Sequence, residues 1–163
     1  MSNTSIAVPE KGQQAPEFEL PSNLGGRVKL ADFKGKYLVL YFYPRDNTPG
    51  CTTEAQQFRQ DKGAFERLGA HIVGVSPDTV ESHCKFADKY GLNFALLADT
   101  EHEVATKYGV WAEKNMYGRK TWGVQRSTFL IGPGGTIVRA WPKVKADGHA
   151  KQVLAELEKA VKG

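Results

Sequence analysis

The sequence contains few cysteines and has neither a long hydrophobic run nor a signal-peptide pattern. Two cysteines among 163 residues are too few for the disulfide framework of a secreted protein, and they suggest a reducing compartment. The longest apolar run, YLVLYFY at 37–43, is far shorter than the roughly 20 residues of a membrane-spanning helix. The N-terminal stretch lacks a basic start followed by an apolar core. We therefore expect a cytoplasmic protein that is not attached to a membrane.

Blocks of like charge and metal-ligand patterns are also missing. The formal net charge is +4, but Lys and Arg are dispersed along the chain, which argues against nucleic-acid binding. The four histidines are scattered and the two cysteines lack C-x-x-C spacing, so no metal site is expected. The missing C-x-x-C pair also argues against a disulfide oxidoreductase of the thioredoxin type.

The composition is that of an ordinary globular protein, with 40% hydrophobic and 25% charged residues. A chain of this length is expected to form one domain over residues 1–163, in which residues 1–14 are a loosely ordered arm. Two short stretches, FEL at 18–20 and RVKL at 27–30, flank the turn sequence PSNLGG. This arrangement predicts a β-hairpin ahead of the main sheet.

Apolar strand patterns alternate with helical patterns in the rest of the chain. The predicted buried strands are YLVLYFY at 37–43, HIVGVS at 71–76 and FALLAD at 94–99. Helices are expected over 51–68, 76–91 and 101–110, the second of them capped by Ser76 and ended by Gly91. The chain closes with a hairpin over 127–142 and an amphipathic helix over 149–163, with Val153, Leu154, Leu157 and Val161 inward. This order predicts an α/β fold of the thioredoxin-like kind, in which a central mixed β-sheet is flanked by helices and extended by the N-terminal hairpin.

Cys51 follows a buried strand and a polar loop, and it falls in the first turn of the predicted helix. Unpaired backbone N–H groups, the positive end of the helix dipole and partial exposure would all favour its thiolate, which is a nucleophile. The alternative is a small apolar residue in the core, which is common for a free cysteine. The polar, turn-rich neighbours RDNTPG argue against that alternative.

The surroundings of Cys51 resemble a known family. YPRDNTPGC contains Pro44, Thr48 and Cys51 in the spacing P-x-x-x-T-x-x-C, which is the peroxidatic motif of peroxiredoxins. The longer stretch YFYPRDNTPGCTTEA is similar to the bacterioferritin comigratory protein or peroxiredoxin Q subfamily. RSTFLIGPGG, from Arg126, resembles the downstream arginine segment of that subfamily. The resemblance runs from about residue 15 to the end of the chain.

The resemblance implies a role for each residue of the motif. Cys51 would attack the peroxide, and Thr48 would hydrogen-bond the thiolate or the peroxide while Pro44 shields the pocket from water. Arg126 would bind substrate and stabilise the charge that develops in the transition state, and Glu54 would hold the arginine. From the residues alone, Thr48 could instead make only a local turn, and Glu54 could be only a first-turn helix acid. A non-catalytic binding module on the same frame would have no use for Thr48 and Arg126 around a thiolate.

The second cysteine departs from the commonest subfamily pattern. Many members carry a resolving cysteine five residues after the first, where this chain has Gln56, so Cys84 is the remaining candidate. On helical spacing Cys84 shares a stripe with Val80 and Ala87, which favours a buried packing residue. The resemblance instead implies that Cys84 resolves the oxidised Cys51 as an intramolecular disulfide. The alternative is a one-cysteine peroxidase with a structural Cys84.

The predicted helix makes this disulfide conditional on movement. If Ser76 is the cap, Cys84 lies eight residues on, roughly 12 Å along the helix axis. A disulfide needs Cα atoms within about 7 Å. We therefore expect oxidation to unwind part of residues 78–90.

The activity that the resemblance implies is that of a thiol peroxidase. Its substrates would be hydrogen peroxide and organic hydroperoxides, and a thioredoxin or a glutaredoxin-like dithiol would recycle it. The resemblance implies a monomer and no metal, haem or flavin cofactor.

Overall fold

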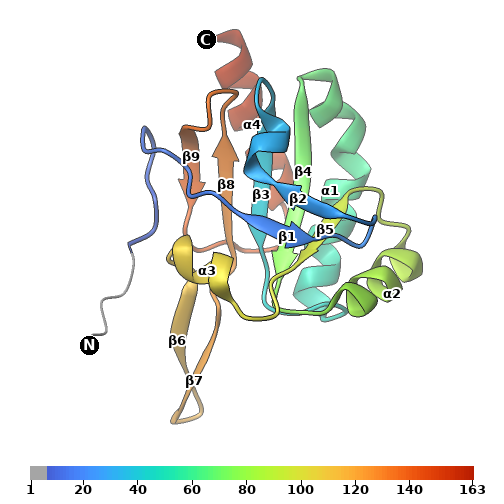
Figure 1. The fold of residues 1–163 in the computed structure, drawn as a ribbon, viewed down its shortest axis with the longest axis vertical. Coiled ribbons are helices and arrows are strands. Elements are labelled where there is room, and N and C mark those ends of the chain that lie inside the picture. Colours follow the sequence, from blue (N-terminus) through green and yellow to red (C-terminus); the bar gives the residue numbers. More distant parts are fainter. Residues whose placement is uncertain (1–6) are drawn as a thin grey trace.

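The computed structural model describes residues 7–163, apart from the side chains of residues 115 and 116. A mixed five-stranded sheet lies at its centre, with strand order β5-β4-β3-β8-β9 (Figure 1). In sheet order its strands are β5 (Ala95–Ala98), β4 (Ala70–Ser76), β3 (Tyr37–Phe42), β8 (Ser127–Ile131) and β9 (Ile137–Trp141). The first three are parallel, while β8 is antiparallel to β3 and β9 is antiparallel to β8. The predicted mixed sheet, with its C-terminal hairpin at one edge, is confirmed.

Strand β3 is buried on both faces, as its continuous apolar run predicts. Val39 and Tyr41 point into one hydrophobic cluster, and Leu38, Leu40 and Phe42 point into a second cluster on the opposite face. This division follows from the two-residue alternation of side chains along a strand. The strand therefore holds the two layers of the molecule together.

Helices cover both faces of the sheet (Figure 1). They are α1 (Pro49–Arg67), α2 (Val80–Tyr90), α3 (Glu103–Lys107) and α4 (His149–Lys162). α1, α2 and α4 pack on the face with Tyr41, whereas α3 and the hairpin of β1 (Glu19–Pro21) and β2 (Arg27–Lys29) pack on the other. The hairpin is antiparallel, as the sequence predicts, and a short 3-10 helix, η1 (Leu30–Phe33), follows it.

The closing helix α4 corrects one prediction about its inward face. Val153 and Leu157 are fully buried and Leu154 is partly buried, as expected. Val161 is 43% exposed, so its predicted inward position is wrong. It belongs to the last turn of the helix, which projects beyond the strands in Figure 1 and has less of the sheet to pack against.

A second exposed hairpin was not predicted from the sequence. Its strands, β6 (Trp111–Met116) and β7 (Arg119–Val124), are antiparallel and extend away from the body of the molecule (Figure 1). They meet at Tyr117 and Gly118, with φ of 54° and 77°, which is the pattern of a two-residue turn of type I′. This turn is hard to recognise in the sequence, because its first position is a tyrosine, where asparagine, aspartate or glycine is usual.

The predicted arm over residues 1–14 lies partly outside the described residues. From Gly12 to Ala15 the chain hydrogen-bonds with the segment from Gly135 to Ile137, at the start of β9. The division into a single domain with an arm stays a prediction. Among the described residues, no helix combines the length and the apolar character needed to cross a membrane.

Candidate active site

The loop between β3 and α1 places Cys51 in the first turn of the helix. Thr48 is the N-cap, with an extended backbone, and Pro49 begins the helix, where its fixed φ is already helical. The first backbone bond joins the N–H of Thr52 to the carbonyl of Thr48 at 2.9 Å. Cys51 therefore lies among the unpaired N–H groups at the positive end of the helix dipole.

Cys51 is buried, so the expected partial exposure is wrong. The residue is 1% exposed and belongs to the apolar cluster that includes Tyr41 and Phe58. Its sulfur accepts a hydrogen bond from Nη2 of Arg126 at 3.3 Å. These neighbours cover the sulfur, and the guanidinium favours the charged thiolate over the neutral thiol.

Arg126 is fixed by contacts at both ends of the residue. Its Nη1 donates to Oε1 of Glu54 at 2.6 Å, and its backbone carbonyl accepts from the N–H of Val144 at 3.0 Å. A Cβ at Gly50 would lie 3.1 Å from Nη2, so the absence of a side chain there leaves room for the guanidinium. Burial lowers the pKa of Arg126, but Glu54 and Cys51 outweigh burial and raise it overall. The guanidinium therefore remains charged between the carboxylate and the sulfur.

Glu54 lies one turn beyond Cys51 and faces the same side of α1. It is 1% exposed, and its Oε2 has no hydrogen-bond partner among the described residues. Burial raises the pKa of Glu54 to about 7, although Arg126 pulls it down. The group that holds the arginine thus changes its charge near neutral pH.

The other two residues of the motif lie on the same loop. The Thr48 hydroxyl donates to the carbonyl of Arg45 at 2.9 Å, so the local turn contact considered from the sequence is present. The hydroxyl oxygen retains lone pairs that can accept a hydrogen bond from a peroxide. Pro44 is half-buried directly after Tyr43 and, as a proline, offers no N–H to water.

The hairpin of β6 and β7 brings a further cation toward the sulfur. Burial and the charge of Arg126 lower the pKa of Lys114, while the Cys51 sulfur raises it. Lys114 therefore lies within electrostatic reach of both groups. The sequence gives no indication of this approach, since the hairpin itself was missed.

Cys84 points in a different direction. It is half-buried on α2, and its sulfur donates to the carbonyl of Asn23, in the turn between β1 and β2, at 3.5 Å. Both cysteines are free thiols. The structure thus gives the two sulfurs separate partners and does not bond them to one another.

Helix α2 also begins later than predicted. Thr79 is the cap, and its hydroxyl oxygen accepts from the N–H of Ser82 at 3.1 Å. Ser76, the predicted cap, ends β4 and donates its hydroxyl to Asp78 at 2.6 Å. The prediction is wrong because a bend separates the strand from the helix. Cys84 is five residues after the true cap (84 − 79), roughly 7.5 Å along the axis instead of 12 Å.

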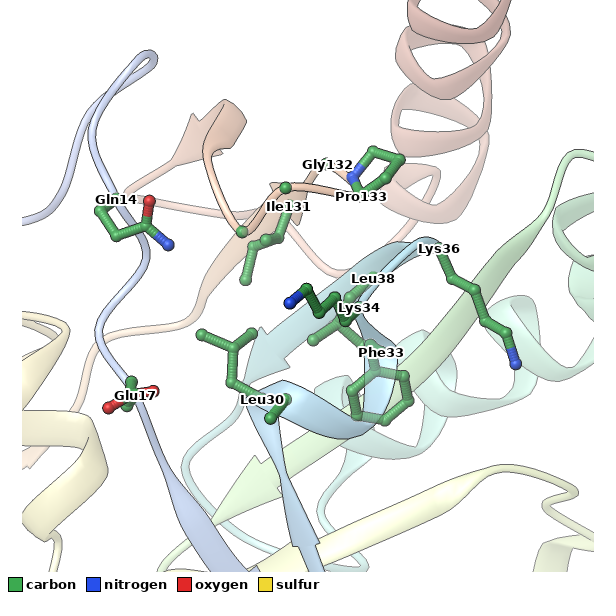
Figure 2. Close-up of a pocket in the computed structure, with 13 residues that line it drawn as sticks. Gln14, Glu17, Leu30, Phe33, Lys34, Lys36, Leu38, Ile131, Gly132 and Pro133 are labelled. Carbon is green, nitrogen blue, oxygen red and sulfur yellow. The ribbon is translucent and has the colours of Figure 1, made fainter.

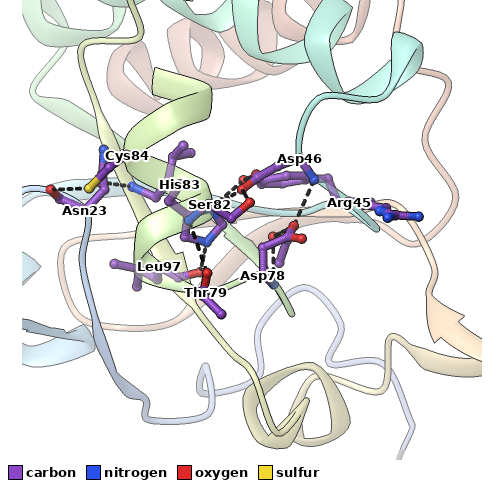
Figure 3. A network of polar contacts seen from close by, with 12 residues as sticks. Asn23, Arg45, Asp46, Asp78, Thr79, Ser82, His83, Cys84 and Leu97 are labelled. Carbon is purple, nitrogen blue, oxygen red and sulfur yellow. Dashed lines mark hydrogen bonds and ion pairs between the residues drawn. The ribbon is translucent and has the colours of Figure 1, made fainter. Parts of the chain in front are cut away.

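The sequence reasoning missed a buried polar network between the Cys51 loop and α2. Its centre is Asp46, whose Oδ2 lies 2.8 Å from Nδ1 of His83 (Figure 3). The sequence patterns point to no role for His83. It lies three residues before Phe86 on the inward face of an amphipathic helix, so the helical period carried a signal that it is buried.

The cavity drawn in Figure 2 is separate from this site. It has a volume of about 280 Å³, and its lining includes Phe33, Lys34, Leu38 and Ile131. Leu38 is near the start of β3, whereas the Cys51 loop follows the end of that strand. The four residue steps of β3 from Leu38 to Phe42 separate the cavity from the start of that loop by roughly 13 Å.

Comparisons with known proteins agree on one family. Residues 11–140 match the AhpC/TSA family. Peroxiredoxin Bcp of Bacillus subtilis is 50% identical over 149 residues, which cover 91% of this chain and 95% of the relative. Among solved structures, the Xanthomonas campestris bacterioferritin comigratory protein, studied for alkyl peroxide reduction, aligns with a TM-score of 0.85 at 44% identity over 88% of this chain and 92% of the other. Xylella fastidiosa PrxQ, solved as a cysteine-to-serine mutant, aligns with a TM-score of 0.89 at 39% identity, over 94% and 98% of the two chains.

Proposed function

This chain belongs to the AhpC/TSA family as a peroxiredoxin of the Bcp/PrxQ type, and we propose that Cys51 is the residue with which it reduces hydroperoxides. Its relatives are peroxiredoxins, which indicates that the chain is a thiol peroxidase. The observation that carries the assignment of Cys51 is its buried sulfur in the first turn of α1, 3.3 Å from the guanidinium of Arg126. The other thiol, Cys84, contacts a neutral carbonyl and has no cationic partner among the described residues.

In the first step the Cys51 thiolate attacks one oxygen of the hydroperoxide. An S–O bond forms as the O–O bond breaks, and the departing oxygen takes up a proton and leaves as water or an alcohol. The sulfur loses two electrons and becomes a sulfenic acid. Arg126 stabilises the negative charge on the reacting atoms. Thr48 accepts a hydrogen bond from the peroxide, and Pro44 limits the access of water.

In the second step Cys84 resolves the sulfenic acid. Its sulfur attacks the sulfur of Cys51, water leaves, and an intramolecular disulfide forms. Because a disulfide requires Cα atoms within about 7 Å and Cys84 is turned toward Asn23, we expect part of α2 to unwind first. An external dithiol, a thioredoxin or a glutaredoxin-like protein, then reduces the bond.

The remaining finer assignments are also proposals. Both cysteines belong to one chain, so a monomer is sufficient for the cycle. The cytoplasmic location stays a prediction from the sequence. Organic hydroperoxides are included among the substrates because the Xanthomonas campestris relative was studied for alkyl peroxide reduction, and because the apolar cluster around Cys51 suits an alkyl group.

A one-cysteine cycle is the second candidate. It is favoured by the contact of the Cys84 sulfur with the Asn23 carbonyl at 3.5 Å, which gives Cys84 a structural role in joining α2 to the N-terminal hairpin. In that cycle the external thiol would attack the Cys51 sulfenic acid directly.

The test is intact-mass measurement and peptide mapping after one equivalent of hydrogen peroxide is added to the reduced protein. For the wild type we expect the loss of two hydrogens and a crosslinked peptide that contains Cys51 and Cys84. Cys51→Ser should show no mass change and no peroxide consumption. Cys84→Ser should gain one oxygen on Cys51.

Two results would change the assignment. An added oxygen on Cys51 of the wild type, with Cys84 still free, would establish the one-cysteine cycle. An unchanged wild-type mass would overturn the assignment of Cys51 as the peroxidatic residue.

A further inference from the structure

Asp46 gathers hydrogen bonds from two elements into one buried network (Figure 3). Its Oδ1 accepts from the Tyr43 hydroxyl at 2.6 Å. Its Oδ2 accepts from the Ser82 hydroxyl at 2.7 Å and pairs with Nδ1 of His83 at 2.8 Å. Its backbone N–H donates to Oδ2 of Asp78 at 2.8 Å. The loop that leads to Cys51 is therefore bonded directly to α2 and to the bend before it.

Both ring nitrogens of His83 have protein oxygens as partners. Nε2 is 2.9 Å from the carbonyl oxygen of Leu97, which can only accept, so Nε2 carries a hydrogen. Nδ1 lies 2.8 Å from Oδ2 of the Asp46 carboxylate. His83 is 0% exposed and Asp46 is 7% exposed, so loss of either partner leaves a buried polar group without its bond.

The same three polar side chains have a spacing that a metal ion can use. Ligand atoms of Asp46, Asp78 and His83 lie within 4.8 Å of one another. Each of these groups is already engaged: Asp46 with Tyr43, Ser82 and His83, Asp78 with Ser76, and both nitrogens of His83 with protein oxygens. The geometry is that of a closed network of protein–protein bonds.

The network connects the neighbourhoods of the two cysteines. Asp46 is five residues before Cys51 (51 − 46), in the loop that leads to α1, and His83 directly precedes Cys84. The next loop residue adds a second connection, since Oδ1 of Asn47 accepts from Lys89 at 3.3 Å and from Tyr90 at 3.1 Å. The loop is thus attached to both ends of α2.

We propose that Asp46 and His83 form a positioning latch that couples the two steps of the peroxidase cycle. In the closed state the pair holds the Cys51 loop in its reactive shape and keeps Cys84 turned toward Asn23. Its opening frees α2 so that Cys84 can approach Cys51. The release half of this inference rests on the two-cysteine cycle proposed above, whereas the positioning half requires only that Cys51 reacts with peroxide.

The reason for the coupling is the direction of adjacent side chains. His83 points to Asp46 and Leu97, while the next side chain, Cys84, points to Asn23. A turn of α2 that swings Cys84 away from Asn23 must also pull His83 out of its buried position. The loop then loses its bonds to α2 at the moment when Cys84 is released.

The test uses two isosteric variants of His83 with separate measurement of the two steps. His83→Gln keeps a donor near Leu97 but loses the bond to Asp46, whereas His83→Asn can keep the donor to Asp46. Stopped-flow measurement gives the rate of Cys51 oxidation, and timed acid quench with mass analysis gives the rate of disulfide formation. For His83→Gln we expect Cys51 oxidation to slow about tenfold, because less of the protein has the reactive loop. We expect disulfide formation to accelerate at least about threefold.

Control variants distinguish the latch from a general effect on helix stability. His83→Asn should keep both rates near those of the wild type. Ala87→Gly weakens α2, because glycine disfavours a helix interior, and it removes none of the hydrogen bonds between α2 and the loop, so it should accelerate only disulfide formation. If His83→Gln fails to fold, Ser82→Ala removes one bond to Asp46. It should slow Cys51 oxidation and accelerate disulfide formation, each by about twofold.

The outcomes separate this inference from the proposed cycle. Wild-type rates for both steps in folded His83→Gln, or two rates that fall together, would overturn the latch while leaving the two-cysteine cycle intact. Absence of any Cys51–Cys84 disulfide in the wild type would overturn that cycle and the release half of the inference. Slower Cys51 oxidation in His83→Gln would still support the positioning half.

Discussion

The surroundings of Cys51 and Cys84 differ although the two residues belong to helices that start at the same edge of the sheet. β3 and β4 are parallel, and α1 and α2 follow their ends. Cys51 is 1% exposed, in a helix of 19 residues, and its sulfur contacts the Arg126 guanidinium. Cys84 is half-buried, in a helix of 11 residues, and its sulfur contacts a neutral carbonyl.

The comparison shows that residues distant in the sequence decide what each thiol can do. α1 is anchored by Phe58 and Phe65, which are fully buried, so Cys51 stands on a rigid element beside a fixed cation. α2 is shorter and depends partly on polar side-chain bonds to the Cys51 loop. The arrangement suits the proposed cycle, in which a preorganised nucleophile reacts first and a second thiol is then released.

Removal of Arg126 should abolish most of the difference in reactivity toward peroxide between the Cys51 and Cys84 thiols. For Arg126→Ala we expect Cys51 oxidation by hydrogen peroxide to slow about 10²–10³-fold, the usual effect of losing one donor to a developing negative charge. Arg126→Lys should recover only part of the rate, because an ammonium cannot bridge Glu54 and Cys51 as the planar guanidinium does. Stopped-flow oxidation of the reduced protein measures both.

The matched control for this prediction is Arg27→Ala. Arg27 pairs with Glu19 between β1 and β2 at 2.9 Å, and this hairpin packs on the sheet face opposite to α1, so the rate should not change. A Cys51 oxidation rate in Arg126→Ala within twofold of the wild type would contradict the role of the guanidinium.

The pH dependence of the free energy of unfolding is a second property that reports on the surroundings of Cys51, because the buried Glu54 belongs to them. Burial raises the pKa of Glu54 from 4.5 to about 7. Its contribution to stability is therefore fully present below pH 4.5 and is lost as the pH rises through 7. The loss amounts to about 3 kcal/mol in the free energy of unfolding. Glu54→Gln retains an acceptor for Arg126 but cannot ionise, so this loss should disappear.

Urea unfolding of both proteins between pH 5 and pH 8 (roughly the range over which the charge changes) measures this prediction. The wild type should lose stability relative to Glu54→Gln as the pH rises. Parallel profiles for the two proteins would show that Glu54 does not titrate in this range.

The smallest expected effect comes from crowding the guanidinium. In Gly50→Ala the new Cβ would lie 3.1 Å from Nη2 of Arg126, which forces the guanidinium to shift by a few tenths of an ångström. We expect Cys51 oxidation to slow roughly fivefold, since a donor must lie close to its intended position. Stopped-flow oxidation again gives the rate.

Gly63→Ala on the same helix is the control for Gly50→Ala. Its Cβ would meet Arg67 at an ordinary 3.6 Å, and alanine should stabilise the helix by about 0.5–1 kcal/mol. Its oxidation rate should match the wild type. Equal rates for both glycine variants would show that Arg126 adjusts freely to the added methyl group.

Much of the fold follows from local patterns in the sequence. The apolar runs of β3, β4 and β5 and the helices after them were predictable, because their alternation and their turn residues are local signals. The hairpin of β6 and β7 was not, because its strands lack an apolar face and Tyr117 masks its turn. The start of α2 was misplaced because Ser76 and Thr79 both suit a cap, and only the course of the chain after β4 selects Thr79.

By itself the sequence determined the order of strands and helices, the place of Cys51 in the first turn of a helix, and the family motif of Pro44, Thr48 and Cys51. Tertiary structure decided that Cys51 is buried against Arg126, 75 residues away along the chain. It also decided that Cys84 faces Asn23 and that Asp46 meets His83 across 37 residues. Local patterns record backbone preferences and hydrophobic period, whereas the direction of a side chain and its polar partners depend on how distant elements pack together.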